Sequence, residues 1–319
     1  MSSRTRTRRE WMGLVTGAAL LSPLKAASSA GFGGGDSASQ RYFRADAVIT
    51  LFSIPIFSKA GVGSGFAFVE DLENSSSRTR RLGFGAGSWP DQAAGLNRLG
   101  YIHETVVESS GGLAQCSYFG FMSTSKEERL EEARAALNQK QQEALFSAVR
   151  GETRAGAYSA RFTRFLSRDA VNWRFWRKVA DAAEKSFDGE CLSRREEQGA
   201  SGNPETVIPT LLYSLLRVRE TGFSPLRTTF IYGGVQRSLE TSSGPDAKMG
   251  ARLRERGIVK NARSVVHMTG VIRNLKLGTK TNFSVWWDRD STSPLPVRIE
   301  LEPKSYLRLA FEADRQSHT

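Results

Sequence analysis

Asp288 and Asp290 lie two residues apart in the stretch WWDRDS, a spacing that can support metal chemistry. Carboxylate oxygens are preferred ligands of hard divalent cations, so an Asp-x-Asp pair can share such an ion with a sugar nucleotide. The alternative is that the pair ends a strand and that its carboxylates accept hydrogen bonds from N–H groups of the turn at residues 291–296. We favour the turn, because it is the commoner role of such a pair.

The histidines do not form a ligand set of recognisable spacing. His103, His267 and His318 are scattered, and no His/Cys/Asp/Glu cluster has the spacing of a structural zinc site. His103 is adjacent to Glu104, but neighbours on a strand point to opposite faces of a sheet. We therefore expect no cofactor and no bound metal.

The remaining small motifs exclude some chemistries. Cys116 and Cys191 form one disulfide or remain two free thiols, and no Cys-x-x-Cys pair is present for a thioredoxin-like site. The glycine-rich stretches GVGSGF and GFGAGSW lack the strand–loop–helix context of a phosphate-binding loop, and neither matches G-x-S-x-G. We interpret them as bends of a curved sheet, where glycine relieves strand curvature.

The stretch RFTRFLSRDAVNWRFWRK interleaves arginines with aromatic residues. Arginine pairs with phosphate and aromatic rings enter apolar interfaces, so Trp173, Trp176, Arg174 and Arg177 are candidate contacts for a ligand or an anionic surface. The alternative is an amphipathic strand and helix with aromatic residues in the core and arginines in water. We favour the alternative.

The N-terminal stretch TRREWMGLVTGAALLSPLKAASSA has the features of a secretory signal: arginines, a short apolar run and small residues. Arg8 and Arg9 resemble the twin-arginine export signal, which predicts a signal peptide over residues 1–30 and an export machinery as partner. The alternative is an amphipathic helix packed on the body. No later run reaches the roughly 20 apolar residues of a transmembrane helix.

The chain has 319 residues and a formal net charge of +12, which favours anionic partners. In the cytosol such a charge would indicate nucleic acid. For an exported chain, lipid head groups and other anionic envelope components are the available anions. We therefore expect a periplasmic or secreted bacterial protein that binds no nucleic acid.

Period-two alternation of apolar residues predicts a single β-rich domain over residues 39–319, preceded by a flexible glycine-rich arm at 31–38. Glycine turns at 109–112 and 233–234 predict two hairpins. Strands are also expected at AYSARFTRFL and, near the C-terminus, at SVVHMTGVI, TNFSVWWD, LPVRIELE and YLRLAFEA.

A central insert of about residues 125–205 interrupts this alternation with helical spacing. A capping box at Ser125 and Glu128 begins the first predicted helix. The expected elements here and beyond are a helix over about 126–147, a second over about 170–187, a polar connector over 188–205, a short helix over 209–216 and a mobile loop over about 242–263.

Three stretches carry a resemblance to a known family: YFRADAVITLFSIPIFSKAGVGSGF, LLYSLLRVRETGFSPLRTTFIYGGVQRSLET and FSVWWDRDSTSPLPVRIELEPKSYLRLAFEA. They resemble an exported bacterial family known as domain of unknown function 3108. The resemblance implies an antiparallel body like an open barrel or lipoprotein-carrier scaffold, and it implies no reaction. The insert departs from the family pattern.

We predict a mainly β (α+β) fold: an open or closed antiparallel barrel-like sheet of lipoprotein-carrier or lipocalin type, with two or three helices in the insert. The expected function is binding of an apolar or amphiphilic envelope ligand at the barrel mouth, rather than catalysis. Two alternatives stay open. One is an envelope hydrolase with a carboxylate pair about 5–9 Å apart in a cleft, and the other is a structural interaction module.

Overall fold

The computed structural model of the chain describes residues 38–51, 54–73, 77–89, 92–93, 98–123, 144–154, 156–167, 176–200, 207–304 and 307–314. The predicted signal peptide, the predicted arm up to residue 37 and most of the predicted helix over 126–147 lie outside these residues.

Eight strands form the first part of a large sheet, and each pairs antiparallel with the next along the chain. Successive side chains of a strand point to opposite faces of the sheet, so each strand has an inner and an outer face. The elements are β1 (Ala38–Leu51), β2 (Ile54–Glu73), β3 (Ser77–Ser88), β4 (Leu99–Ser109), β5 (Gly112–Ser123), β6 (Ala144–Arg154), β7 (Ala157–Ser167), α2 (Trp176–Asp188) and β8 (Ser193–Ala200).

Six further antiparallel strands follow the helix α3. The elements are α3 (Leu211–Glu220), β9 (Arg227–Tyr232), β10 (Val235–Pro245), α4 (Ala247–Glu255), the 3-10 helix η5 (Ala262–Ser264), β11 (Val265–Asn274), β12 (Lys280–Asp288), β13 (Arg298–Lys304) and β14 (Leu307–Ala313). The predicted C-terminal strands, both hairpins and the short helix near 209–216 are confirmed.

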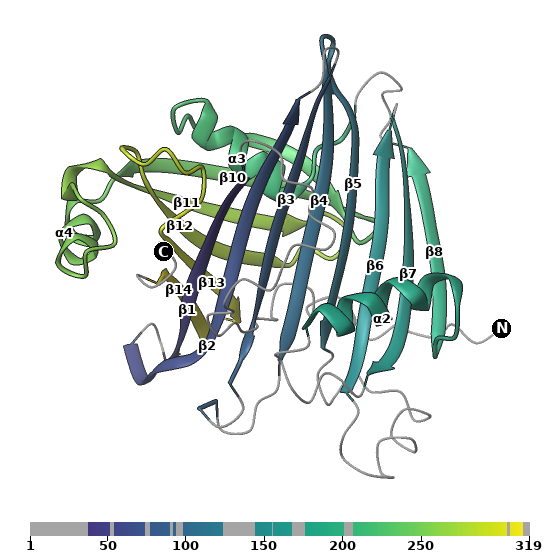
Figure 1. Cartoon of the computed structure of the whole chain (residues 1–319), viewed down its shortest axis with the longest axis horizontal. Coiled ribbons are helices and arrows are strands. Elements are labelled where there is room, and N and C mark those ends of the chain that lie inside the picture. Colours follow the sequence, from purple (N-terminus) through teal and green to yellow (C-terminus); the bar gives the residue numbers. More distant parts are fainter. Residues whose placement is uncertain are drawn as a thin grey trace.

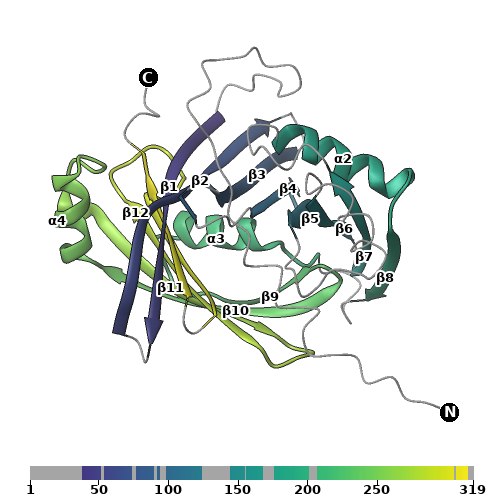
Figure 2. The same ribbon diagram turned by 90° about the horizontal axis from the view of Figure 1, so that it is seen from below.

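One sheet of fourteen strands results, in the order β8-β7-β6-β5-β4-β3-β2-β1-β14-β13-β12-β11-β10-β9. Strands β1–β8 form a first meander and strands β9–β14 a second. The two meanders join where β14 pairs with β1, and β8 and β9 remain as edges, so the barrel is open. The sheet curls around α3, whereas α2 and α4 lie outside the ring (Figures 1 and 2). The predicted open, barrel-like antiparallel fold is confirmed.

The strand register decides which side chains face α3. Val69, Leu82, Glu104 and Tyr118 are successive partners across β2, β3, β4 and β5, so they form one row on the inner face. Gly151 continues this row on β6. A Cβ atom at Gly151 would lie 2.2 Å from the Tyr118 ring, so the absence of a side chain gives that ring its place.

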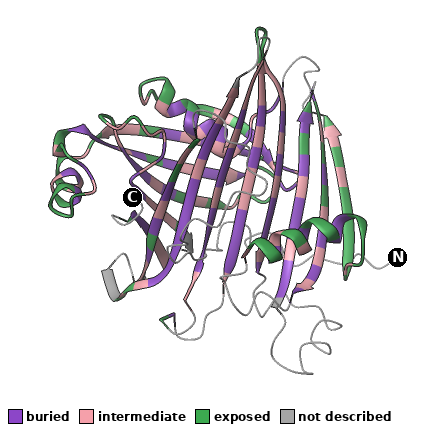
Figure 3. Cartoon of the chain, in the orientation of Figure 1, coloured by how far each residue is buried: buried purple, intermediate pink, exposed green. Residues whose placement is uncertain are grey.

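Two predictions for the central insert are wrong in part. Residues 144–147, predicted as the end of a helix, begin β6, because Ala144–Ser147 pairs with Arg164–Ser167 of β7. Residues 193–200, predicted within a connector, form β8. β8 has no alternation in its sequence, because it is an edge strand exposed on both faces (Figure 3). The predicted strand β7 is confirmed.

The predicted mobile loop over about 242–263 is also wrong. β10 extends to Pro245, and α4 follows at once, with its N-terminus capped by the Asp246 carboxylate, which accepts a hydrogen bond from the Met249 N–H at 2.9 Å. Leu253, a residue of α4, is fully buried and anchors the helix to the sheet. The sequence predicts a loop here because the two apolar residues that α4 packs inward, Met249 and Leu253, are too few to give a clear helical periodicity.

Candidate functional site

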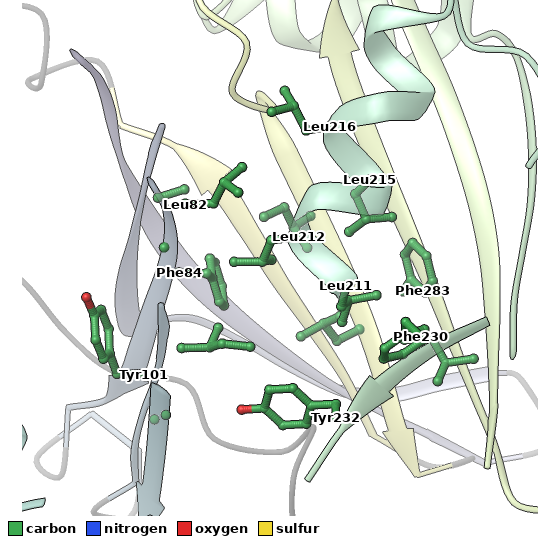
Figure 4. Close-up of a pocket in the computed structure, with 18 of the residues that line it drawn as sticks. Leu82, Phe84, Tyr101, Leu211, Leu212, Leu215, Leu216, Phe230, Tyr232 and Phe283 are labelled. Atoms are coloured by element: carbon green, nitrogen blue, oxygen red, sulfur yellow. The ribbon is translucent and has the colours of Figure 1, made fainter. Parts of the chain in front are cut away.

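An apolar cavity of about 260 Å³ lies between the inner face of the sheet and α3. This volume is slightly below the range of about 300–1,000 Å³ that is typical of small-molecule sites. Strands from both meanders and one side of the helix form its wall (Figure 4). Among the lining residues are Leu82, Phe84, Leu211, Leu212, Leu215, Leu216, Phe230, Tyr232 and Phe283.

α3 is apolar on two sides, because it is packed between the two meanders. Tyr213 and Leu216 pack with the core of β1–β5, whereas Val218 is buried against β9–β12. Leucines at 211, 212, 215 and 216 have a spacing that places all four on one broad face of the helix, toward the cavity. Two of them, Leu211 and Leu215, face the second meander.

Glu104 holds the N-terminus of α3. Its two carboxylate oxygens accept hydrogen bonds from the backbone N–H groups of Leu212 and Tyr213, both at 3.0 Å. The first N–H groups of a helix have no partner within the helix, and the side chain of the N-cap residue, Thr210, does not cap them here. Burial raises the pKa of Glu104 to about 7, and the two hydrogen bonds oppose this shift. The carboxyl group therefore takes up a proton at a higher pH than an exposed glutamate does.

Arg80 holds the other end of the helix. Its guanidinium lies 2.7 Å from Glu220, at the end of α3, and within 3.4 Å of Glu108 and Asp71. Burial lowers the pKa of Arg80, but these three carboxylates outweigh it and the pKa is raised overall. The hydroxyl of Tyr213 donates a short hydrogen bond to Glu108, which ties the first turn of the helix to the same cluster.

The wall of the cavity contains few polar groups. Ser147 and Thr281 contribute hydroxyls, and Arg237 is the single charged residue that the described chain places in the lining. No carboxylate of the described residues lines the cavity, so the carboxylate pair expected of a hydrolase is not formed there. The arrangement can enclose an apolar molecule and offer it one positive charge.

The predicted contact residues lie elsewhere. Trp176 belongs to α2, which packs on the outer face of the sheet. Its ring centroid lies 5.1 Å from that of Phe66 and 5.2 Å from that of Tyr101. Arg177 has its guanidinium 5.7 Å from the Trp176 ring. Neither residue lines the cavity. Trp173 and Arg174 lie outside the described residues.

α2 itself matches the predicted helix over about 170–187 in its described part. Val179, Ala183 and Phe187 are buried against the outer face of β6 and β7. Thr163 on β7 forms a buried hydrogen bond of 2.6 Å with Ser186. The apolar stripe therefore docks the helix, as the amphipathic interpretation expects.

The Asp-x-Asp pair ends β12 and serves a turn, as expected. Asp288 accepts hydrogen bonds from the Ser264 hydroxyl and from the Asp290 N–H, and Asp290 accepts one from Asn261. Within the described ranges, no group of three His, Cys, Asp or Glu residues is placed to hold a metal ion. Cys116 is buried and Cys191 is partly exposed, and both are free thiols.

Sequence reasoning missed Glu104, Arg80 and Arg237 as functional candidates. Glu104 and Arg237 each interrupt a row of apolar residues at period two, for example Val235, Arg237 and Leu239, whereas Arg80 follows a second arginine, Arg78, in its row. A charged residue in such a row is a usable signal, because a buried charge needs a partner.

No protein-family model matches the sequence, and no curated protein matches it. Membership of the domain of unknown function 3108 family therefore stays a prediction. Among solved structures, the chain is similar to a β-barrel-like protein of domain of unknown function DUF1849 from Brucella abortus, with 12% identity over 86% of this chain and 94% of that one. The TM-score is 0.39, and a likeness at this level establishes neither family nor function. None of the described helices is both long enough and apolar enough to cross a membrane.

Proposed function

We propose that this chain binds an apolar or amphiphilic small molecule of the bacterial envelope in the cavity beside α3. The observation that carries the proposal is the cavity of about 260 Å³ with an almost entirely apolar wall. A buried apolar cavity that is not filled by side chains lowers stability, because its wall loses dispersion contacts. A ligand that fills the cavity restores those contacts and removes its own apolar surface from water.

The proposed location is the periplasm or the extracellular space. Support comes from the sequence of residues 1–30, with Arg8 and Arg9 ahead of a short apolar run. An envelope location would bring the chain into contact with lipids and their breakdown products. These molecules have the apolar chains that the cavity wall accommodates.

A fluorescent probe tests the cavity directly. N-phenyl-1-naphthylamine, which is apolar and uncharged, should bind the purified protein with enhanced fluorescence. Ser147 lines the cavity on β6, so Ser147→Phe should fill it and weaken probe binding at least tenfold. The matched control is Ser159→Phe on the exposed surface of β7, which should bind the probe as the parent does.

Equal binding by the parent and Ser147→Phe would refute the proposal. Native mass spectrometry of protein purified from envelope fractions gives a second, independent readout. A retained lipid-sized adduct is expected in the parent and should be absent in Ser147→Phe.

A further inference from the structure

Arg237 is a buried charge that has no hydrogen-bond or ion-pair partner among the described residues. The residue lies on β10, is 6% exposed, and lines the cavity. Its Nε and Nη2 atoms are buried and have no hydrogen-bond partner in the described part of the chain. A guanidinium stays protonated in proteins, so the charge cannot be removed by deprotonation. An unpaired charge in an apolar wall is unfavourable unless something else supplies the anion.

The other buried charges of the described chain show how the fold treats this problem. Each has a partner within reach: Arg41, Glu70, Arg80, Glu104, Arg298 and Glu312. Arg41, for example, donates to the carbonyl oxygens of Leu295 and Pro296 at 2.7 and 3.0 Å. Arg237 is the exception, and it is also the one that lies in the cavity wall.

Two tyrosines add neutral donors near this guanidinium. Tyr232 precedes the β9–β10 turn and Tyr118 lies on β5, with ring centroids 5.1 Å apart. Both are close enough to Arg237 to affect its pKa electrostatically. Burial raises the pKa of Tyr118 to about 12 and raises that of Tyr232 as well. Their hydroxyl groups therefore keep their protons and can donate hydrogen bonds.

We infer that Arg237 binds the anionic head group, a carboxylate or a phosphate, of a single-chain amphiphile whose apolar tail occupies the rest of the cavity. The inference rests on the proposed function and names the ligand class. A guanidinium can donate two parallel hydrogen bonds to the two oxygens of such a head group. The modest volume of the cavity suits one apolar chain rather than several.

Matched ligands of one chain length test the inference. Dodecanoate, dodecyl phosphate and dodecanol share a tail and differ in the head, and their affinities are measured by displacement of N-phenyl-1-naphthylamine. We expect at least one of the two anions to bind the parent tenfold or more tightly than dodecanol. The tighter of the two anions identifies the head group. Acetate and inorganic phosphate should not displace the probe, because they have no tail.

Variants assign the preference to one side chain. Arg237→Met should bind dodecanol as the parent does and lose the preference for the anion, whereas Arg237→Lys should keep part of it. Arg227→Met, at an exposed position of the same hairpin, is the matched control and should keep the full preference. Arg237→Met should also melt no lower than the parent, since it removes an unpaired buried charge.

Two results separate this inference from the proposed function. If dodecanol and both anions bind the parent equally, or if Arg237→Met keeps the preference, the role of Arg237 is wrong and the apolar cavity stands. If neither the probe nor any of the three amphiphiles binds, the proposed function fails and this inference fails with it. A marked drop in the melting temperature of Arg237→Met would also overturn it, since the guanidinium would then have a structural role.

Discussion

The contact between Glu104 and α3 predicts an unusual pH dependence of stability. Glu104 is fully buried and accepts hydrogen bonds from two N–H groups of the helix, so its protonation state is linked to the docking of α3. Burial raises its pKa from 4.5 to about 7 in the folded chain. In the unfolded chain the same group is hydrated and has its ordinary pKa.

The sign and the magnitude follow from proton linkage. Between pH 4.5 and about 7 the folded state binds more protons at this position than the unfolded state, so the free energy of unfolding falls as the pH rises. The stabilisation is complete below pH 4.5 and is lost as the pH passes through about 7. The difference between the two pKa values corresponds to about 3 kcal/mol.

Glu104→Gln removes the titration and retains one carbonyl oxygen as an acceptor for the helix. Urea unfolding, followed by tryptophan fluorescence at pH 4, 5, 6, 7 and 8, gives the free energy of unfolding of both proteins. The stability of the parent relative to Glu104→Gln should fall by about 3 kcal/mol across this range. Other titrating groups, such as His103 and His267, are present in both proteins and cancel in the difference.

The matched control is Glu190→Gln, at an exposed position after α2. Its stability relative to the parent should be independent of pH within about 0.5 kcal/mol. If the difference between the parent and Glu104→Gln is also constant from pH 4 to pH 8, burial does not raise the pKa of Glu104, and our account of the docking of α3 is wrong.

Two further predictions concern α2 and the N-terminus. Trp176→Ala should lower the free energy of unfolding by an amount near the low end of about 3–5 kcal/mol, because the ring is only partly buried. Arg177→Ala, at an exposed position of the same helix, should change it by less than about 0.5 kcal/mol. Equal melting temperatures for Trp176→Ala and the parent would disprove the packing role. Arg8→Lys combined with Arg9→Lys should leave full-length precursor in the cytoplasm, as seen in cell fractions on an immunoblot, and normal export of the double variant would exclude the twin-arginine route.

Local patterns predict the strands that have one apolar row and a tight turn. β4 and β5 follow from alternation and the glycine turn at 109–112, and β9 and β10 from Gly233 and Gly234, which adopt φ angles of 62° and 64°. β8 could not be predicted this way, because its sequence SRREEQGA owes its extended form to pairing with β7. The sequence does not predict α4 for a related reason. Its N-cap, Asp246, is adjacent in sequence, but Leu253 holds the helix in place through contacts with residues of other elements, such as Trp286.

The candidate site was harder to predict, because it depends on contacts between distant residues. α3 was predicted as a short helix, but its position inside the sheet depends on Glu104, which is 108 residues before Leu212 in the chain. The stretch RFTRFLSRDAVNWRFWRK supplies the predicted ligand contacts because its mixture of arginines and aromatic residues is unusual. Its described part packs on the outer face of the sheet, because rings such as Trp176 and Phe187 find aromatic partners there.

The charged contacts of α3 and its apolar packing have different roles. A helix with apolar side chains toward both meanders could rotate or shift between them with little change in buried area. The directional contacts at its ends, Glu104 with the first N–H groups and Arg80 with Glu220, admit one position. Buried ionic contacts add little net stability but can fix one arrangement among several. The cavity wall formed by Leu212 and Leu215 is thereby set before a ligand arrives, and a preformed site loses less affinity to ordering.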